Sequence, residues 1–184
     1  MKTHQGFTLL ELLITLSLSA LLISLTIPSF TKTIQKHHID SNMSKMHKFL
    51  NYARSYALDQ NTDVHICGSN DSVCAKEWSN TLFIFVDKNN NNEPDEEEIL
   101  KKYSFDLELD YIKSRLATGS KYTVFKPQGN VSWTGSFIYC PNDNKEENFR
   151  RVTWNRVGRS YRGRDTNGDG IIEDRNGEVL ACRN

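Results

Sequence analysis

The strongest pattern in the chain is an apolar run near its N-terminus. From Phe7 to Ile27 there are 21 residues, of which 14 are apolar and only Glu11 is charged. As a helix rising about 1.5 Å per residue, this run would be about 31 Å long, which matches the hydrocarbon core of a bilayer. The sequence therefore predicts a membrane-spanning helix over residues 7–28.

Beyond Pro28, apolar residues recur every three to five positions, as on one face of a helix. These positions are Phe30, Ile34, Ile39, Met43, Met46, Leu50, Ala53 and Ala57. We expect one continuous helix from Phe7 to about Leu58. Its amphipathic second half, residues 29–60, is expected to pack on a globular domain.

From Asp63 onward the pattern changes to short β-rich segments separated by turn residues. The expected strands are Val64–Cys67, Thr81–Val86, Ile99–Phe105, Tyr122–Phe125, Ser136–Cys140 and Arg151–Trp154. Apolar and polar residues alternate in Lys121–Phe125, which is typical of an antiparallel sheet with one face in water. A helix followed by strands predicts an α+β fold in which the helix lies across an antiparallel sheet and residues 61–184 form one β-rich domain.

Composition adds information mainly through where the charges lie. The chain has 184 residues, with 23 Lys+Arg and 23 Asp+Glu, so its net charge favours no class of partner. Asp87 to Asp110 contains nine acids and three lysines, whereas Arg150 to Arg164 contains six arginines and no acid. These two segments would attract different ligands.

The junction Gly6-Phe7 precedes the apolar run, whereas a secretory signal would place its cleavage site after it. The helix is therefore expected to stay with the mature protein. The residues that carry a family resemblance are Gly6, Phe7, Thr8, Leu9, Leu10 and Glu11. They resemble the class III signal of type IV pilins and type II secretion pseudopilins. The resemblance implies that residues 1–6 are a leader removed by a prepilin peptidase and that Phe7 becomes an N-methylated N-terminus.

Glu11 would be costly in a membrane, by about 2.5–3.5 kcal/mol. That cost disfavours a plain membrane anchor, which gains nothing from an acid. The family resemblance implies instead that Glu11 pairs with the α-amino group of Phe7, on its own or a neighbouring subunit, when the helix enters a filament core. The alternative is that Glu11 lies near the membrane surface and extends its carboxylate into water.

A second resemblance covers nearly the whole chain. Its features are Cys67-Gly68, Trp78, Phe83–Asp87, Phe125–Gly129, Phe137–Cys140 and Val157–Arg159. These are similar to the GspH/FimT branch of the pilin-like superfamily, which implies a type IV pilin fold and a minor subunit that assembles with other pilins or pseudopilins. The family implies no enzyme, and the sequence contains neither a Ser/His/Asp set nor a nucleotide-binding glycine loop.

All four cysteines follow the apolar run and would face the oxidising side if the positive leader stays in the cytoplasm. Cys67 and Cys74 flank a loop short enough for a local disulfide, and Cys140 and Cys182 would then tie a core strand to the C-terminal end. Four cysteines allow three pairings, and the sequence excludes none of them. A zinc site is the competing interpretation, but the gap between Cys67 and Cys74 exceeds the usual spacing of about two to four residues.

Two acidic loops have spacings close to that of a calcium-binding EF-hand loop. The first offers Asp87, Asn89, Asn91, Asp95 and Glu98 as candidate ligands, with Asn92 where the loop usually has glycine. The second begins at Asp165, has Gly170 at position 6 and offers Asn176 at position 12. Each loop is expected to bind Ca²⁺ weakly or to be a polar hairpin turn, which Asn, Asp and Gly favour. No other cofactor is expected.

The arginine-rich segment suggests a nucleic-acid site. Its members are Arg150, Arg151, Arg156, Arg159, Arg162 and Arg164, on the last strand and a tail, with Trp154 and Tyr161 between them. Arginines clamp phosphates and aromatic rings stack on bases, so the segment is expected to bind double-stranded DNA, as in FimT-like subunits with Gly-Arg-rich tails. The alternative is a solvated strand face with ion pairs to the acidic half.

The sequence thus predicts a minor pilin or pseudopilin, held in the bacterial inner membrane with a periplasmic globular domain and then assembled into a pilus or pseudopilus. DNA uptake through the arginines is one expected role. A type II secretion pseudopilin H that supports export without binding DNA is the alternative, and a membrane-anchored calcium-binding domain is the third hypothesis.

Overall fold

The computed structural model describes residues 6–69, 73–76, 78, 81–105, 110–142, 145–174, 177–180 and 182, with only the backbone described for residues 25–32. Residues 1–5 of the predicted leader, the ring of Pro28 and Asn176 therefore lie outside the described residues. The chain divides into two compact units, Met1–His38 and Ile39–Asn184. The α1 helix, Leu9–Gln60, contributes residues to both units.

Both ends of α1 are defined by local hydrogen bonds. Thr8 caps the start, because its Oγ1 accepts a hydrogen bond from the Glu11 backbone N–H at 3.2 Å. At the other end, Asn61 adopts a left-handed conformation with φ of 49°, and the Thr62 N–H donates to the Ala57 carbonyl at 3.3 Å. The predicted helix from Phe7 to about Leu58 is confirmed to within two residues at each end.

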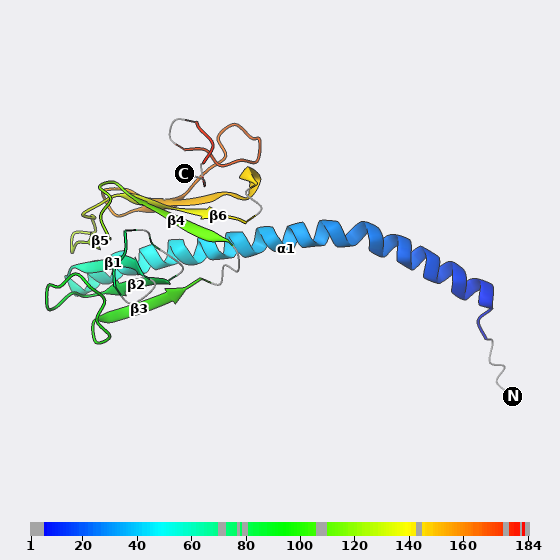
Figure 1. The fold of residues 1–184 in the computed structure, drawn as a ribbon, viewed down its shortest axis with the longest axis horizontal. Helices are drawn as coiled ribbons and strands as arrows, with labels where there is room; N and C mark the ends of the chain where they lie inside the picture. The colour runs from blue at the N-terminus through cyan, green and yellow to red at the C-terminus, as the bar shows by residue number, and fades with distance from the viewer. Residues whose placement is uncertain are drawn as a thin grey trace. The chain divides into compact units, whose positions relative to one another are not determined.

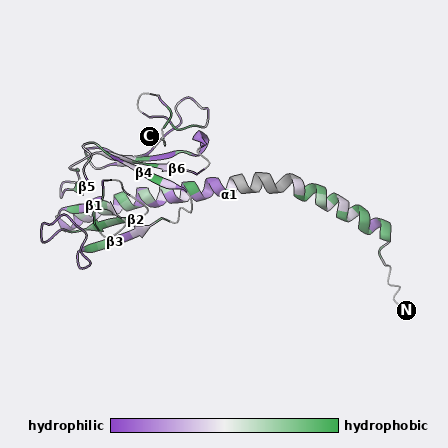
Figure 2. Ribbon diagram, in the orientation of Figure 1, coloured by the Kyte–Doolittle hydropathy of each residue, from purple (hydrophilic) through white to green (hydrophobic). Residues whose placement is uncertain are grey.

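In the first unit, the described apolar side chains of α1 are exposed. Phe7 is 80% exposed, and every described leucine and isoleucine from Leu9 to Ile23 is also exposed. Figure 2 shows this part of the helix as mainly hydrophobic, in green. The sequence predicts a membrane span at residues 7–28, whereas among the described residues no helix is long and apolar enough to cross a membrane.

In the second unit, the predicted apolar stripe of α1 is buried from Ile39 onward. Ile39, Met43, Met46, Leu50, Ala53 and Ala57 are all at most 2% exposed. Ile34 is 54% exposed, so the prediction that the stripe begins before Ile39 is wrong for this residue. The side chain of Phe30 is not among those described.

Among the described residues, eight strands form two four-stranded antiparallel sheets (Figure 1). The first sheet, in the order β3-β2-β1-β5, contains β1 Val64–Ser69, β2 Thr81–Phe85, β3 Ile99–Ser104 and β5 Tyr122–Phe125. The second sheet, in the order β4-β6-β7-β8, contains β4 Tyr111–Leu116, β6 Gly135–Cys140, β7 Arg150–Trp154 and β8 Ser160–Arg162. A short 3₁₀ helix, η1, covers Glu146–Asn148.

The main core joins α1 to both sheets. Ile39 to Ala57 of the helix pack with Ile66 and Ile84 of the first sheet and with Phe137 and Trp154 of the second. The predicted α+β fold is confirmed, although the strands form two sheets rather than the single expected one.

Two smaller clusters lie outside the main core. One surrounds the disulfide Cys67–Cys74 and includes Phe83 and Phe85. The other surrounds the disulfide Cys140–Cys182 and includes Ile138, Phe149 and Leu180. The two expected pairings are therefore confirmed, and no cysteine remains free for zinc.

Candidate functional site

Nothing in the local structure around Gly6 requires a glycine. A Cβ atom at this position would meet no heavy atom within 4 Å, and Gly6 is not among the glycines with positive φ. Phe7 and the following residues are exposed, so the segment is accessible. Among the described residues, packing does not account for a glycine at this position, and its role at the processing junction stays a prediction.

Glu11 occupies the third position after the Thr8 cap, at the positive end of the helix dipole. A carboxylate in the first turn stabilises a helix start by about 0.3–1 kcal/mol, so Glu11 has a local role besides the assembly role that the sequence suggests. Thr8 was not predicted as the cap, although Thr8-Leu-Leu-Glu11 matches the capping-box pattern.

The arginine-rich segment is a strand pair rather than a strand and a flexible tail. β7 and β8 are antiparallel, with Val152 opposite Arg162 and Trp154 opposite Ser160. Val152 and Trp154 are buried, whereas Arg151 and Thr153 alternate with them and are partly exposed. Trp154 is fully buried and cannot stack on bases, which corrects that part of the prediction, while Tyr161 is 41% exposed.

The turn between the two strands is held in place by glycines. Gly158 has φ of 73°, and a Cβ on it would lie 2.0 Å from the Gly129 carbonyl oxygen. That carbonyl also accepts a hydrogen bond from Arg54 Nε of α1 at 3.1 Å. This close backbone contact fixes the turn that carries Arg156 and Arg159.

Two of the six arginines are engaged by α1. Arg150 Nε lies 3.2 Å from Asp40 Oδ1, and its Nη1 donates to backbone carbonyls of Glu147 and Phe149. Arg162 Nη2 donates to Ser44 Oγ at 2.7 Å. Burial and the nearby Arg162 charge lower the pKa of His47 on the same helix.

The other arginines remain available for a ligand. Arg156, Arg159 and Arg164 are exposed and form no salt bridge with any described residue. Arg151 has a buried Nε without a hydrogen-bond partner among the described residues. Among the described residues, the ion pair that these arginines form joins Arg150 to Asp40 of α1, which lies outside the acidic segment Asp87–Asp110.

These side chains line two cavities on the second sheet. The first, of about 600 Å³, is lined by Arg115, Arg151 and Arg156. The second, of about 340 Å³, is lined by Arg151, Arg162 and Arg164 together with Glu173 and Asp174. The second acidic loop, which begins at Asp165, therefore lies beside Arg151, Arg162 and Arg164. Arg115 was not among the predicted site residues, because the strand that carries it, β4, was not predicted.

The first acidic loop is held together by its own hydrogen bonds. Asp87 accepts hydrogen bonds from the backbone N–H groups of Asn91 and Asn92, at 3.1 and 3.0 Å. Asp95 Oδ2 accepts hydrogen bonds from the side-chain amides of Asn89 and Asn91, at 2.7 and 2.8 Å. Asn92 has a left-handed φ of 61°, so asparagine takes the conformation usually given to glycine.

Glu98 completes that loop, and its Oε1 accepts a hydrogen bond from the Lys88 N–H at 2.8 Å. No group of three acids within metal-binding reach of one another forms in the described residues of this loop. Glu98 is 7% exposed and its Oε2 has no hydrogen-bond partner among the described residues, so calcium binding by this loop stays a prediction beside the polar turn.

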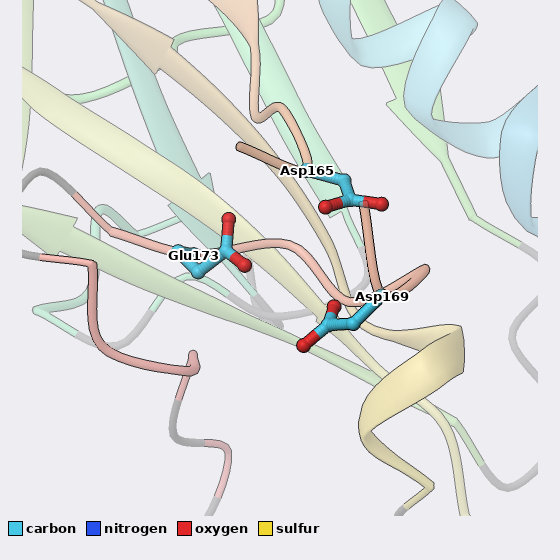
Figure 3. Close-up of side chains that lie close together, drawn as sticks. All are labelled: Asp165, Asp169 and Glu173. Carbon is cyan, nitrogen blue, oxygen red and sulfur yellow. The ribbon is translucent and has the colours of Figure 1, made fainter. Parts of the chain in front are cut away.

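The second acidic loop, by contrast, brings three carboxylates together. Single carboxylate oxygens of Asp165, Asp169 and Glu173 all lie within 4.8 Å of one another (Figure 3). Hydrogen bonds from the backbone N–H groups of Gly170 and Gly168 lower the pKa of Asp165.

Comparison with known proteins agrees with the fold. Residues 43–158 match the family described as type II transport protein GspH, and residues 1–27 match the prokaryotic N-terminal methylation motif. No curated relative matches the chain.

Two kinds of solved structure are similar. The type IV minor pilin FimU of Pseudomonas aeruginosa is 22% identical with a TM-score of 0.55, over 68% of this chain and 87% of that one. The minor pseudopilin EpsH from the type 2 secretion system of Vibrio cholerae is 12% identical with a TM-score of 0.51, over 68% of this chain and 95% of that one. These likenesses show the pilin fold. Because the family match extends over more than half of the sequence, this chain belongs to the GspH family of pilin-like proteins and carries their N-terminal methylation motif.

Proposed function

We propose that this minor pilin or pseudopilin binds double-stranded DNA through the arginines of its second sheet. The family is structural and not enzymatic, so a role in binding and assembly is the appropriate class. The observation that carries the proposal is the exposure of Arg156, Arg159 and Arg164 without a salt bridge to any described residue.

The assembly part of the proposal rests on the N-terminal segment. The methylation motif at residues 1–27 implies cleavage by prepilin peptidase, a stage in the inner membrane and then incorporation among other pilins. We place the cut after Gly6, so that Phe7 becomes the N-terminus and Glu11 pairs with an α-amino group in the filament. The exposed apolar face of Leu9 to Ile23 supplies the surface that neighbouring helices would cover.

The DNA-binding part rests on the chemistry of guanidinium groups. Arginine binds phosphate oxygens bidentately, and such contacts carry no sequence preference. Arg156 and Arg159 lie on the turn fixed by Gly158, and the nearby Arg151 lines both cavities of this face. Phosphate groups are therefore the expected ligands of this face.

A pseudopilin that supports protein export without binding DNA is the second candidate. It is favoured by the likeness to EpsH, whose TM-score of 0.51 is close to that of FimU. In this case the arginines would be a solvated surface, and their removal would leave secretion unchanged.

We expect the full chain, purified in detergent, to bind double-stranded DNA with a log-log salt slope of roughly −4 to −5, corresponding to about four to six phosphate contacts. The variant Arg156→Gln/Arg159→Gln/Arg164→Gln should bind at least about tenfold more weakly at low salt, with a slope flatter by about three. Gel shifts over a range of salt concentrations measure both quantities.

The matched control is Lys76→Gln/Lys88→Gln/Lys121→Gln, which removes the same charge from exposed positions away from the second sheet. This control should bind nearly as well as the unaltered chain. Equal weakening by the two triple variants would indicate a nonspecific charge effect, and absence of binding by the unaltered chain would leave the secretion role as the better account.

We expect Glu11→Ala to reduce incorporation into filaments several-fold while the amount in the membrane fraction stays unchanged, because the variant loses only a charge. Immunoblots of sheared filaments and membranes measure this, and mass spectrometry shows whether the mature chain begins with methylated Phe7. The control is Thr8→Ala, which removes the helix cap, worth about 1 kcal/mol, but keeps the acid. An equal defect in both variants would mean that Glu11 acts through the helix start rather than through a partner.

A further inference from the structure

We propose that the loop Asp165–Glu173 binds one Ca²⁺ ion through the carboxylates of Asp165, Asp169 and Glu173. One oxygen from each carboxylate lies within 4.8 Å of the other two, and the three side chains face one another in Figure 3. Three like charges so close together repel one another, and a cation between them would replace this repulsion by attraction. The ligands of this site are acids, and the site borders the arginines proposed to bind DNA.

Glu173 provides an independent observation. Glu173 is only 6% exposed, and its Oε1 atom has no hydrogen-bond partner among the described residues. The other oxygen, Oε2, accepts hydrogen bonds from the backbone N–H and the hydroxyl of Thr166, at 2.9 and 2.8 Å. An unpartnered oxygen on a buried carboxylate is unfavourable, and a bound cation would satisfy it.

The rest of the loop holds the acids in position. Asp165 Oδ1 and Oδ2 accept hydrogen bonds from the N–H groups of Gly168 and Gly170, at 2.6 and 2.7 Å. Both glycines have positive φ, of 86° and 87°, with open space where a Cβ would be. Glycine is therefore required for the backbone conformation and not for packing.

The ligand chemistry selects calcium. All three groups are carboxylates, which hard cations prefer, and Asn167 adds a further oxygen side chain in the same loop. Zinc would usually require histidine or cysteine, and neither is part of this group. Mg²⁺ demands a near-octahedral set at shorter distances, whereas Ca²⁺ accepts the flexible geometry of an exposed loop.

Binding would also affect the neighbouring surface. Glu173 lines the same cavity as Arg162 and Arg164, so an ion held by Glu173 would reduce the negative potential beside those arginines. The Ca²⁺ measurement needs no DNA, so its outcome does not depend on whether the proposed DNA binding is correct.

The test uses the full chain in detergent after treatment with a chelator. Equilibrium dialysis with radioactive calcium should show one ion per chain with a Kd of about 0.1–1 mM, as in extracellular calcium modules. CaCl₂ should raise the thermal midpoint, and MgCl₂ at the same ionic strength should raise it much less. Asp169→Asn is the principal variant because Asp169 is exposed, so its replacement leaves the core intact. It should weaken Ca²⁺ binding about tenfold or more.

Two controls carry the same loss of charge. Glu178→Gln alters an exposed acid in the same C-terminal segment, and Asp95→Asn alters the first acidic loop. Both should retain the calcium affinity of the unaltered chain. The proposal is overturned if the unaltered chain binds no Ca²⁺ at millimolar concentration, if Asp169→Asn binds normally, or if Asp95→Asn abolishes binding.

Discussion

Replacing Trp154 with alanine is expected to lower the free energy of unfolding by about 3–5 kcal/mol, the range for truncating a buried aromatic side chain. Trp154 is fully buried, with its ring centroid 5.1 Å from that of Phe137 and 6.2 Å from that of Trp78. Its Nε1 donates a hydrogen bond to the Trp133 carbonyl at 2.9 Å. The variant would leave a cavity, and the Trp133 carbonyl would keep only the hydrogen bond that it accepts from the Thr123 hydroxyl at 2.8 Å.

Urea unfolding followed by far-UV circular dichroism measures this loss. Trp133→Ala is the matched control, because Trp133 is 40% exposed and its backbone carbonyl remains in place. The control should cost less than about 1 kcal/mol. A loss of similar size in both variants would contradict the central packing role of Trp154.

Removing the second disulfide by Cys140→Ala/Cys182→Ala is expected to cost about 4 kcal/mol. The bond joins residues 42 apart, and the stabilisation comes mainly from restricting the unfolded chain, which increases with the length of the closed loop. The loop closed by this disulfide includes the arginine segment and the proposed calcium site. Loss of the disulfide should therefore also increase cleavage by proteases in the segment that follows Gly158.

The first disulfide provides the comparison. Cys67 and Cys74 are only seven residues apart, so Cys67→Ala/Cys74→Ala should cost about 2 kcal/mol by the same argument. All four cysteines are buried, so the two double variants remove similar side chains from similar surroundings. The same urea experiment measures the loss of unfolding free energy in each double variant. Equal losses, or a larger loss without the first disulfide, would show that loop closure is not the main source of the stabilisation.

Much of the fold could be predicted from local pattern. The amphipathic stripe after Ile39 predicted the buried face of α1, and all six expected strands are present with ends shifted by at most two residues. β4 and β8 were missed. β4 contains Lys113 and Arg115 and has only one buried position, while β8 has three residues, two of them exposed. Such strands depend on pairing with β6 and β7, which the local sequence does not reveal.

For the arginines and the acidic loops, the sequence predicts which residue types could bind a ligand, but not which other residues they contact. The six arginines are recognisable in the sequence as a group, and their role in DNA binding stays a prediction. Only the fold shows that Arg150 contacts Asp40, which is 110 residues away in sequence. The spacing of ligands along the sequence favoured the loop at Asp87 as the calcium site, because its oxygen side chains fit the EF-hand pattern more completely. The structure instead brings acids together in the loop at Asp165, since burial of Glu173 depends on the packing of the C-terminal segment.

The separate apolar cluster around Cys140 and Cys182 has a consequence for protein engineering. Leu180 and Ile172 pack there with Ile138 and Phe149, apart from the main core that joins α1 and both sheets. The loop 166–170, which lies between β8 and this cluster, is exposed. Changes in the length or charge of this loop are therefore expected to leave the main core intact. A foreign peptide inserted there would be displayed on the surface of a folded domain.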